Sequence, residues 1–354
     1  MHTVVQKQKI TQKDIARYAG VTRSLVSYVI NGSDRTVAPE TRKKILRAIE
    51  DLDYRPNKFA QALMRGDAGT LAYKQIGIVL CRDDVFLRPY YAEILAGIHS
   101  AAHAFSHHIR FIRFFNELKD PVLFNQLIHT EEICGLLLVA TDQCLETAED
   151  WQIIERIRER IGQIVCVEWR AEGLSSVYFD RQAAACKAVN YLFDKGYTDI
   201  VYIGESDERV SGFKQAFLEH GVNDLSKLFI DSARDMPSGY EAIRRLHEGQ
   251  SPGKLPGQLF RLPQAICAGS DEVAIGILLY LNEHTVKIPG DVAIISIDNI
   301  EMAEYTYPPL TTMNVQKRAM GYQAVEMIVN NTAVQGEKAL NLSFQTTIVI
   351  RKSS

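Results

Sequence analysis

From Gln75 onward, the sequence alternates short apolar runs with amphipathic stretches, and this alternation restricts the folds that the chain can adopt. The apolar runs are typical of strands buried on both faces, and the stretches between them repeat apolar residues at helical spacing. The strands are predicted in two successive series, at 75–81, 109–115, 134–140, 163–168 and 175–180, and then at 199–204, 264–269 and 291–298. The intervening helices are predicted at 91–106, near 151–160, and at 181–195, 208–220 and 271–283. This order predicts two α/β blocks with parallel sheets, and a ligand cleft beyond the carboxyl ends of the strands.

A different pattern precedes the alternation, because two short helical segments surround a single glycine. The first segment begins at Thr11, and Gly20 is expected to end it, since glycine adopts a positive φ at little cost. Thr22 can cap the second segment, and a third helix is predicted from Pro39. Two helices joined by a short turn and braced by a third predict a helix-turn-helix, whose second helix fits the major groove of DNA. The alternative is an ordinary three-helix scaffold.

The distribution of charge favours a nucleic-acid partner for this N-terminal head. Residues 1–66 hold 13 Lys and Arg against 6 Asp and Glu, a net charge of +7. The whole chain carries −3, so residues 67–354 carry −10. A basic head on an acidic body is attracted to phosphates through the head alone.

Length and cysteine usage limit the remaining classes of protein. At 354 residues the chain has room behind the head for one large two-lobed unit. No run of 18 apolar residues indicates a membrane span, and the first residues, MHTVVQKQKI, lack the apolar core of a signal peptide. The six cysteines are scattered without a Cys-x-x-Cys pair, so we expect neither disulfides nor zinc, and a reducing cytoplasm as the setting.

Several segments together resemble the lactose/galactose repressor family of bacterial transcription regulators, almost from end to end. They are DIARYAGVTRSLVSYVIN in the head, and RPYYAEILAGI, GYTDIVYIG, RVSGF, AGSDEVAIGILLYLNE and PPLTTM in the body. The resemblance implies an effector bound between two periplasmic-binding-protein-like (type I) lobes, and a homodimer on a palindromic DNA operator. Family members mostly sense sugars, and a few sense nucleobases or nucleosides, so the effector stays open between these classes.

The resemblance also implies a division into domains. Residues 1–56 would form the all-α helix-turn-helix domain, and 57–74 a hinge helix and linker. Residues 75–354 would form the effector-binding and dimerisation domain. The boundary between its lobes is expected near 175, with further crossings near 300 and 320.

The polar face of the second helix supplies the predicted DNA contacts. We expect Arg23, Ser24 and Tyr28 to touch base edges. The predicted phosphate contacts are Thr22, Ser27 and Asn31. Tyr28 stands where many family members have arginine, which leaves the operator sequence open.

The short segment after the head is predicted to act as a hinge. Asn57–Arg65 is too short for a stable isolated helix, so two copies in a dimer would order each other on DNA. The resemblance implies that Leu63 is the family's hinge leucine, wedged into the minor groove, and we assign Asn57 and Ala60 to the DNA contacts as well. The alternative is a simple tether.

Five residues are predicted to line the effector site. By similarity, Arg209 and Asp271 match positions that contact the effector, and both follow strand ends. Their charges suit hydrogen bonds to vicinal hydroxyls, and the alternative for Arg209 is a cap or an ion pair at the start of its helix. Trp169, Tyr90 and Phe86 would supply walls. The alternative for Trp169 is packing between the lobes, and for Tyr90 and Phe86 it is core packing. The segment between Gly204 and Arg209 is shorter than is usual in the family, so one wall of the site is expected to differ. No leucine-heptad tail follows the last strand, which favours a dimer over a tetramer.

The sequence gives little support to a metal site, an enzyme or a transport protein. Histidines spaced four apart could suggest a metal site, but no carboxylate or cysteine completes it; they are His99, His103, His107 and His108. The chain has no Gly-x-Gly-x-x-Gly, phosphate loop or Gly-x-Ser-x-Gly motif, and nothing partners Asp83 and Asp84 for acid–base work. We therefore expect no catalytic residues and no cofactor. A sugar-binding transport protein is the rival class, and it would have a signal peptide and no DNA-reading head.

Overall fold

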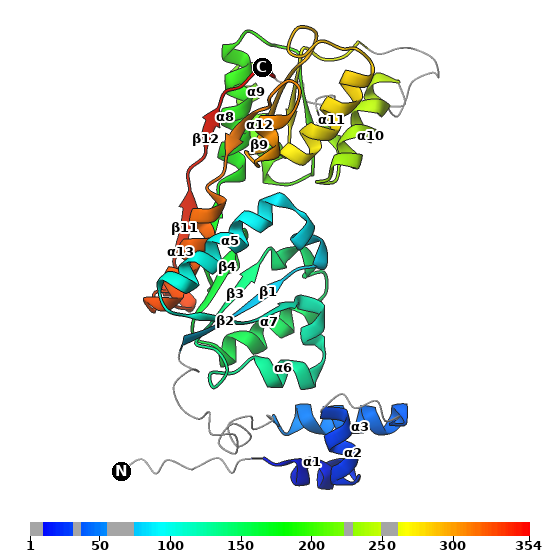
Figure 1. The fold of residues 1–354 in the computed structure, drawn as a ribbon, viewed down its shortest axis with the longest axis vertical. Helices are drawn as coiled ribbons and strands as arrows, with labels where there is room; N and C mark the ends of the chain where they lie inside the picture. Colours follow the sequence, from blue (N-terminus) through cyan, green and yellow to red (C-terminus); the bar gives the residue numbers. More distant parts are fainter. Residues whose placement is uncertain (1–9, 31–36, 55–73, 223–228, 249–260) are drawn as a thin grey trace. The chain divides into compact units, whose positions relative to one another are not determined.

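The computed structural model describes residues 10–30, 37–54, 74–222, 229–248 and 261–354 (Figure 1). The chain divides into two compact units. Unit 1 comprises Met1–Leu87, Ala96–Val177 and Gly321–Asn341, and unit 2 comprises Arg88–Leu95, Tyr178–Met320 and Leu342–Ser354. The chain therefore passes between the units several times. The hinge segment and Asn31 lie outside the described residues.

Three helices form the head within unit 1, as predicted. They are α1 (Gln12–Ala19), α2 (Arg23–Ile30) and α3 (Pro39–Asp51). The carboxylate of Asp14 accepts hydrogen bonds from the backbone amide and the hydroxyl of Thr11, at 2.9 and 2.6 Å, which fixes the start of α1. Gly20 ends α1 with a φ of 65°, and its amide bonds to the carbonyls of Ala16 and Arg17. The glycine turn inferred from the sequence is therefore confirmed.

The first sheet has six strands in the order β11-β5-β4-β3-β1-β2. Its strands are β1 (Gln75–Leu80), β2 (His108–Phe114), β3 (Gly135–Val139), β4 (Ile164–Val167), β5 (Ser175–Phe179) and β11 (Asn341–Phe344). The pairs from β2 across to β5 are all parallel. Every residue of β3 and β4 is buried, because helices cover both faces of such a sheet.

The second sheet repeats this plan with six strands in the order β12-β10-β9-β8-β6-β7. Its strands are β6 (Ile200–Gly204), β7 (Phe229–Asp231), β8 (Ala265–Ala268), β9 (Ala293–Asp298), β10 (Thr311–Asn314) and β12 (Thr347–Val349). Only the pair β10–β12 is antiparallel among the paired strands described. The second strand series predicted from the sequence thus forms one sheet.

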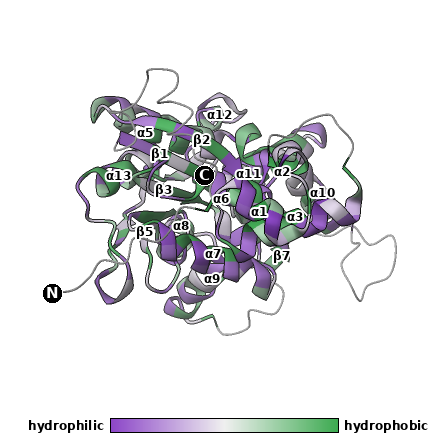
Figure 2. Ribbon diagram, turned by 90° about the horizontal axis from the view of Figure 1, so that it is seen from below, coloured by the Kyte–Doolittle hydropathy of each residue, from purple (hydrophilic) through white to green (hydrophobic). Residues whose placement is uncertain are grey.

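Helices connect the strands in both units. The α-helices are α5 (Pro89–Ala104), α6 (Pro121–Leu127), α7 (Ala148–Arg160), α8 (Arg181–Asp194), α9 (Glu208–Glu219), α10 (Met236–His247), α11 (Asp271–Glu283), α12 (Met302–Tyr305) and α13 (Lys317–Val329). Shorter 3-10 turns are η2 (Asp83–Leu87), η3 (Phe115–Lys119), η4 (Thr141–Cys144) and η5 (Gly336–Lys338). Many residues of α7 and α9 are hydrophilic (Figure 2), whereas Ile153 and Ile157 of α7 and Phe213 and Phe217 of α9 are buried. These helices therefore bury one face and leave the other to solvent.

The stretch 221–263 differs from the sequence analysis, which placed no element there. It holds β7 and α10 among its described residues. β7 has three residues and no buried position, so it lacks the apolar run that marked the other strands. α10 does carry a start signal, since the side chain of Asp235 accepts from the amide of Ser238 at 2.7 Å.

Candidate functional site

The first residues of α2 are polar and exposed, whereas the apolar face of the same helix is buried. The hydroxyl of Thr22 accepts a hydrogen bond from the amide of Leu25 at 3.4 Å and so caps the helix. Val26 and Val29 are buried in the head core. The residues predicted to face DNA are Thr22, Arg23 and Ser24, which are exposed, and Ser27 and Tyr28, which are half-buried. The first turn of α2 is therefore the most accessible part of this face.

A second basic surface lies on α3. Its exposed cationic residues are Arg42, Lys43, Lys44 and Arg47. Together with Arg23 they place exposed cationic side chains on two helices of the head, which suits contacts with phosphates. The sequence indicates the net charge of the head but not where these residues lie on it.

Arg209 is held rigidly in unit 2. Its guanidinium forms hydrogen bonds to both carboxylate oxygens of Asp207, at 2.6 to 3.1 Å, and also to the carbonyl of Gly269. Burial alone would raise the pKa of Asp207, but the hydrogen bonds and charge of Arg209 outweigh burial and leave this pKa lowered. The side chain of Arg209 is 4% exposed, so it stabilises the end of the strand and leaves little surface for contact with a ligand.

Asp271 lies at the first position of α11 and is completely buried. Its Oδ1 accepts hydrogen bonds from the hydroxyls of Ser296 and Thr312, at 2.5 and 2.6 Å. Its Oδ2 accepts from the amide of Ile300 at 2.7 Å. Burial raises the pKa of Asp271 to about 6, although these hydrogen bonds and the charge of Lys317 act in the opposite direction. Both oxygens thus hold the ends of β9 and β10 together, and the predicted effector contact of Asp271 stays a prediction.

Ion pairs of charged residues that were not predicted from the sequence lie beside Arg209 and Asp271. Arg88 forms an ion pair with Glu272 at 2.9 Å, and its guanidinium also donates to the carbonyl of Arg234 at 2.8 Å. The side chain of Arg234 in turn pairs with Glu205, and its guanidinium lies 3.7 Å from Asp207. Arg88 lies in the segment RPYYAEILAGI, whose resemblance to the family could have pointed to it. Arg234 lies in the stretch 221–263, where no element was predicted.

The predicted aromatic walls fall into both units. In unit 2, Tyr90 is 6% exposed and packs edge-on against Tyr91, with ring centroids 5.3 Å apart. In unit 1, Trp169 is 4% exposed, and its indole nitrogen donates to the carbonyl of Leu138 at 2.9 Å. Phe86, also in unit 1, is 48% exposed and meets the ring of Phe114 at 6.0 Å. Tyr90, Arg209 and Asp271 therefore share one unit, and Phe86 and Trp169 share the other.

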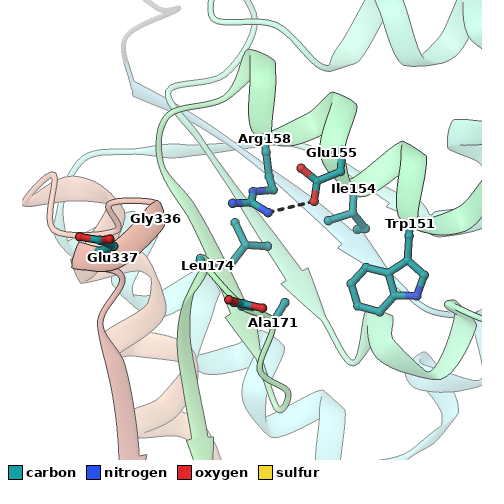
Figure 3. Close-up of a pocket in the computed structure, with 10 residues that line it drawn as sticks. Trp151, Ile154, Glu155, Arg158, Ala171, Leu174, Gly336 and Glu337 are labelled. Carbon is teal, nitrogen blue, oxygen red and sulfur yellow. Dashed lines mark hydrogen bonds and ion pairs between the residues drawn. The ribbon is translucent and has the colours of Figure 1, made fainter. Parts of the chain in front are cut away.

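A cavity of about 640 Å³ lies elsewhere in unit 1, between α7, the β4–β5 connection and η5 (Figure 3). The exposed indole of Trp151 stands at one side, and the ion pair of Glu155 and Arg158, at 2.9 Å, stands above it. None of the predicted effector residues lines this cavity.

The described residues also bear on metal binding and on insertion into a membrane. No cluster of three or more His, Cys, Asp or Glu side chains among them could hold a metal ion. Within the same ranges, no helix combines the length and the apolar character needed to cross a membrane.

Known proteins match both parts of the chain. Residues 11–57 match the bacterial regulatory proteins of the lacI family, and residues 189–354 match the periplasmic binding protein-like domain. The chain is 29% identical over 333 residues to the ribose operon repressor of Escherichia coli, covering 90% of this chain and 92% of that protein. It is 25% identical over 355 residues to the HTH-type transcriptional repressor PurR of Edwardsiella ictaluri, covering 97% and 96%.

Two solved structures resemble the fold over nearly the whole chain. The transcriptional regulator CelR in complex with cellobiose gives a TM-score of 0.65 at 24% identity, covering 98% of this chain and 100% of that one. The lac repressor dimer bound to operator and the anti-inducer ONPF gives 0.64 at 20% identity, covering 98% and 99%. The predicted fold class, an N-terminal helix-turn-helix with a two-lobed α/β domain, is confirmed.

Proposed function

Because the chain belongs to the lacI family of bacterial regulatory proteins, we propose that it is a sequence-specific DNA-binding repressor whose affinity for its operator is set by a small molecule. The observation that carries this proposal is the exposed first turn of α2, with Arg23 and Ser24 free of the head core. These side chains have the donor groups that read base edges in the major groove. The repressor would act in the cytoplasm, with no catalytic step of its own.

A sugar is the effector that we propose first. Ion-paired side chains around Arg209 in unit 2 offer charged donors and acceptors, including Asp207, Glu205 and Arg234. Such groups bind vicinal hydroxyls through charge-assisted hydrogen bonds. The ribose operon repressor and the cellobiose complex of CelR support a carbohydrate, since each is similar to this chain.

A nucleobase or nucleoside is the second candidate. Tyr90 and Tyr91 form an edge-to-face pair in unit 2, and a flat base can stack on a tyrosine ring. The ion-paired groups would then recognise the polar edge of the base.

We propose a homodimer as the DNA-bound species, with residues 1–56 as the reading head, 57–74 as the linker and 75–354 as the effector domain. Unit 2 exposes large apolar side chains that a second copy could cover, among them Leu279, Tyr305 and Tyr307 at 54%, 77% and 83% exposure. The amide of Asn282 donates to the carbonyl of Tyr307 at 2.7 Å, which keeps the end of α11 beside this tyrosine. Two heads on a two-fold site would double the contacts with DNA.

The test combines DNA and effector binding by the purified full chain. An operator is first obtained by selection from random DNA, and sugars and nucleosides are then screened by thermal shift. A ligand at 100 times its Kd should add about 2.7 kcal/mol to the free energy of unfolding. The same ligand should change operator affinity. A chain that selects no DNA sequence would refute the proposed function, and a nucleoside hit without any sugar hit would refute the first choice of effector.

A further inference from the structure

The carboxyl end of α3 packs against helices α6 and α7 within unit 1. Val122 of α6 belongs to the same buried apolar cluster as Ile45 and Ile49 of α3. Asn125, which is fully buried, points its amide toward the carbonyl of Ile49 at 3.5 Å. The head is therefore in direct contact with the α/β part of its own unit, in addition to the covalent connection through residues 55–73.

Two arginines of α7 complete this contact, one turn apart on the same face of the helix. The guanidinium of Arg160 lies 2.5 Å from the carboxylate of Asp53 and donates to the side-chain carbonyl of Asn125 at 2.8 Å. Arg156 pairs with Glu50 at 3.4 Å. Both guanidinium groups also lie over the ring of Phe124, at 4.3 and 4.8 Å from its centroid. Stacking of this kind orients the charged groups before any partner is met.

The charges of the two surfaces are complementary. Two adjacent cations on α7 repel each other unless anions stand opposite, and the head supplies such anions at this point. Only six acidic residues occur in positions 1–66, and two of them, Glu50 and Asp53, pair with the two arginines. The rest of the head is basic, so the acidic end of α3 is distinguished from the surface that would face DNA.

We propose that Phe124, Asn125, Arg156 and Arg160 form a docking surface for the head, which holds α2 in an orientation suited to DNA. This role rests on the proposed function. Thr22, Arg23 and Ser24 remain exposed in the docked arrangement, so docking does not cover the reading surface. A docked head has less orientational freedom to lose when it binds DNA, and docking should therefore strengthen operator binding. In the chain, α7 is followed directly by β4 and Trp169. The docking surface therefore also connects the head to Trp169, a predicted wall of the effector site.

Hydrogen exchange of the full chain, read by mass spectrometry, tests the dock without DNA. Arg156→Glu should raise the exchange of residues 50–54 and of α6 by about threefold or more, since it replaces an ion pair with a repulsion. Glu50→Arg alone should do the same, and the double variant should return to within about twofold of the wild type. Arg158→Glu is the matched control, because Arg158 lies on the same helix but pairs with Glu155. Amides of α1 and α2 report whether the head stays folded.

Wild-type exchange in both single variants, with the head still protected, would overturn the dock. So would equal exchange in the control and in Arg156→Glu. The second measurement is affinity for DNA selected by the wild-type chain. Arg156→Glu should weaken it by about threefold to tenfold, and the double variant should recover it. Tighter binding by Arg156→Glu would mean that the dock restrains the head, and would overturn the proposed role. A wild-type chain that selects no DNA would refute the proposed function, while the exchange results would still decide the dock.

Discussion

The surroundings of Asp271 were only partly predictable from the sequence. We predicted Asp271 as an effector contact by its similarity to the lactose/galactose repressor family and because it follows a strand end. In the structure, the two carboxylate oxygens of Asp271 accept hydrogen bonds from the hydroxyls of Ser296 and Thr312 and from the amide of Ile300. Those partners come from distant parts of the chain, so spacing along the sequence could not reveal them. The same applies to Arg209, whose partner Gly269 lies 60 residues away.

The titration of Asp271 should be visible in the pH dependence of stability. Its pKa is raised to about 6 from an ordinary 3.8, so the folded chain binds its proton more tightly than the unfolded chain does. Its contribution is therefore complete below about pH 4 and is lost as the pH rises through 6. Asp271→Asn cannot titrate. We expect the free energy of unfolding of the wild type, relative to this variant, to fall on the order of 2 kcal/mol between pH 4 and pH 7 in urea titrations. A difference that does not change with pH would contradict this assignment.

A single residue, Gly20, determines the geometry of the turn between α1 and α2. Its φ is 65°, and a Cβ there would meet nothing within 4 Å, so any cost of a side chain is purely conformational. Gly20→Ala should destabilise the head by about 1 kcal/mol and weaken operator binding with it. Gly221 is a matched position after α9, with a φ of 77° and equally open surroundings. Gly221→Ala should cost similar stability by urea denaturation and leave operator affinity unchanged. Equal losses of operator affinity in both variants would show that the turn has no special role in the head.

The elements differ in how well their sequences predict them. The strands of both series were predicted within about two residues, because parallel strands buried on both faces leave a continuous apolar run. β7 was missed because its three residues are only partly buried. α13 was missed as well, since KRAMGYQAVEMIV has no clear polar face. The paired charges of the candidate site lie on separate elements, and only the fold brings Arg88 to Glu272.

A substitution at one exposed apolar residue of α11 tests how the whole molecule assembles. Leu279→Lys places a charge on the face of α11 that exposes Leu279, and burying that charge in an interface would be costly. We expect the variant to be monomeric in light scattering at micromolar concentration, and the wild type to be a dimer. Leu218→Lys is the control, since Leu218 on α9 is exposed to a similar extent, 55% against 54%. A dimeric Leu279→Lys variant would place the interface elsewhere, and a wild-type tetramer would contradict the predicted dimer.

The predicted role of the hinge segment, residues 57–65, also depends on the assembled dimer. It remains a prediction, with Leu63 as the minor-groove wedge and Asn57 and Ala60 as further contacts, because these residues lie outside the described ranges.

Selection from random DNA tests whether α2 reads DNA sequence. The wild type should enrich a two-fold symmetric site. Arg23→Ala should change the preferred base at one position of each half-site, at about 1–3 kcal/mol for the wild-type sequence. Arg42→Ala on α3 is the control, and it should weaken binding to all sequences without changing the preferred site. The same enriched site for Arg23→Ala and the wild type would contradict the account, as would a wild-type chain that enriches no site.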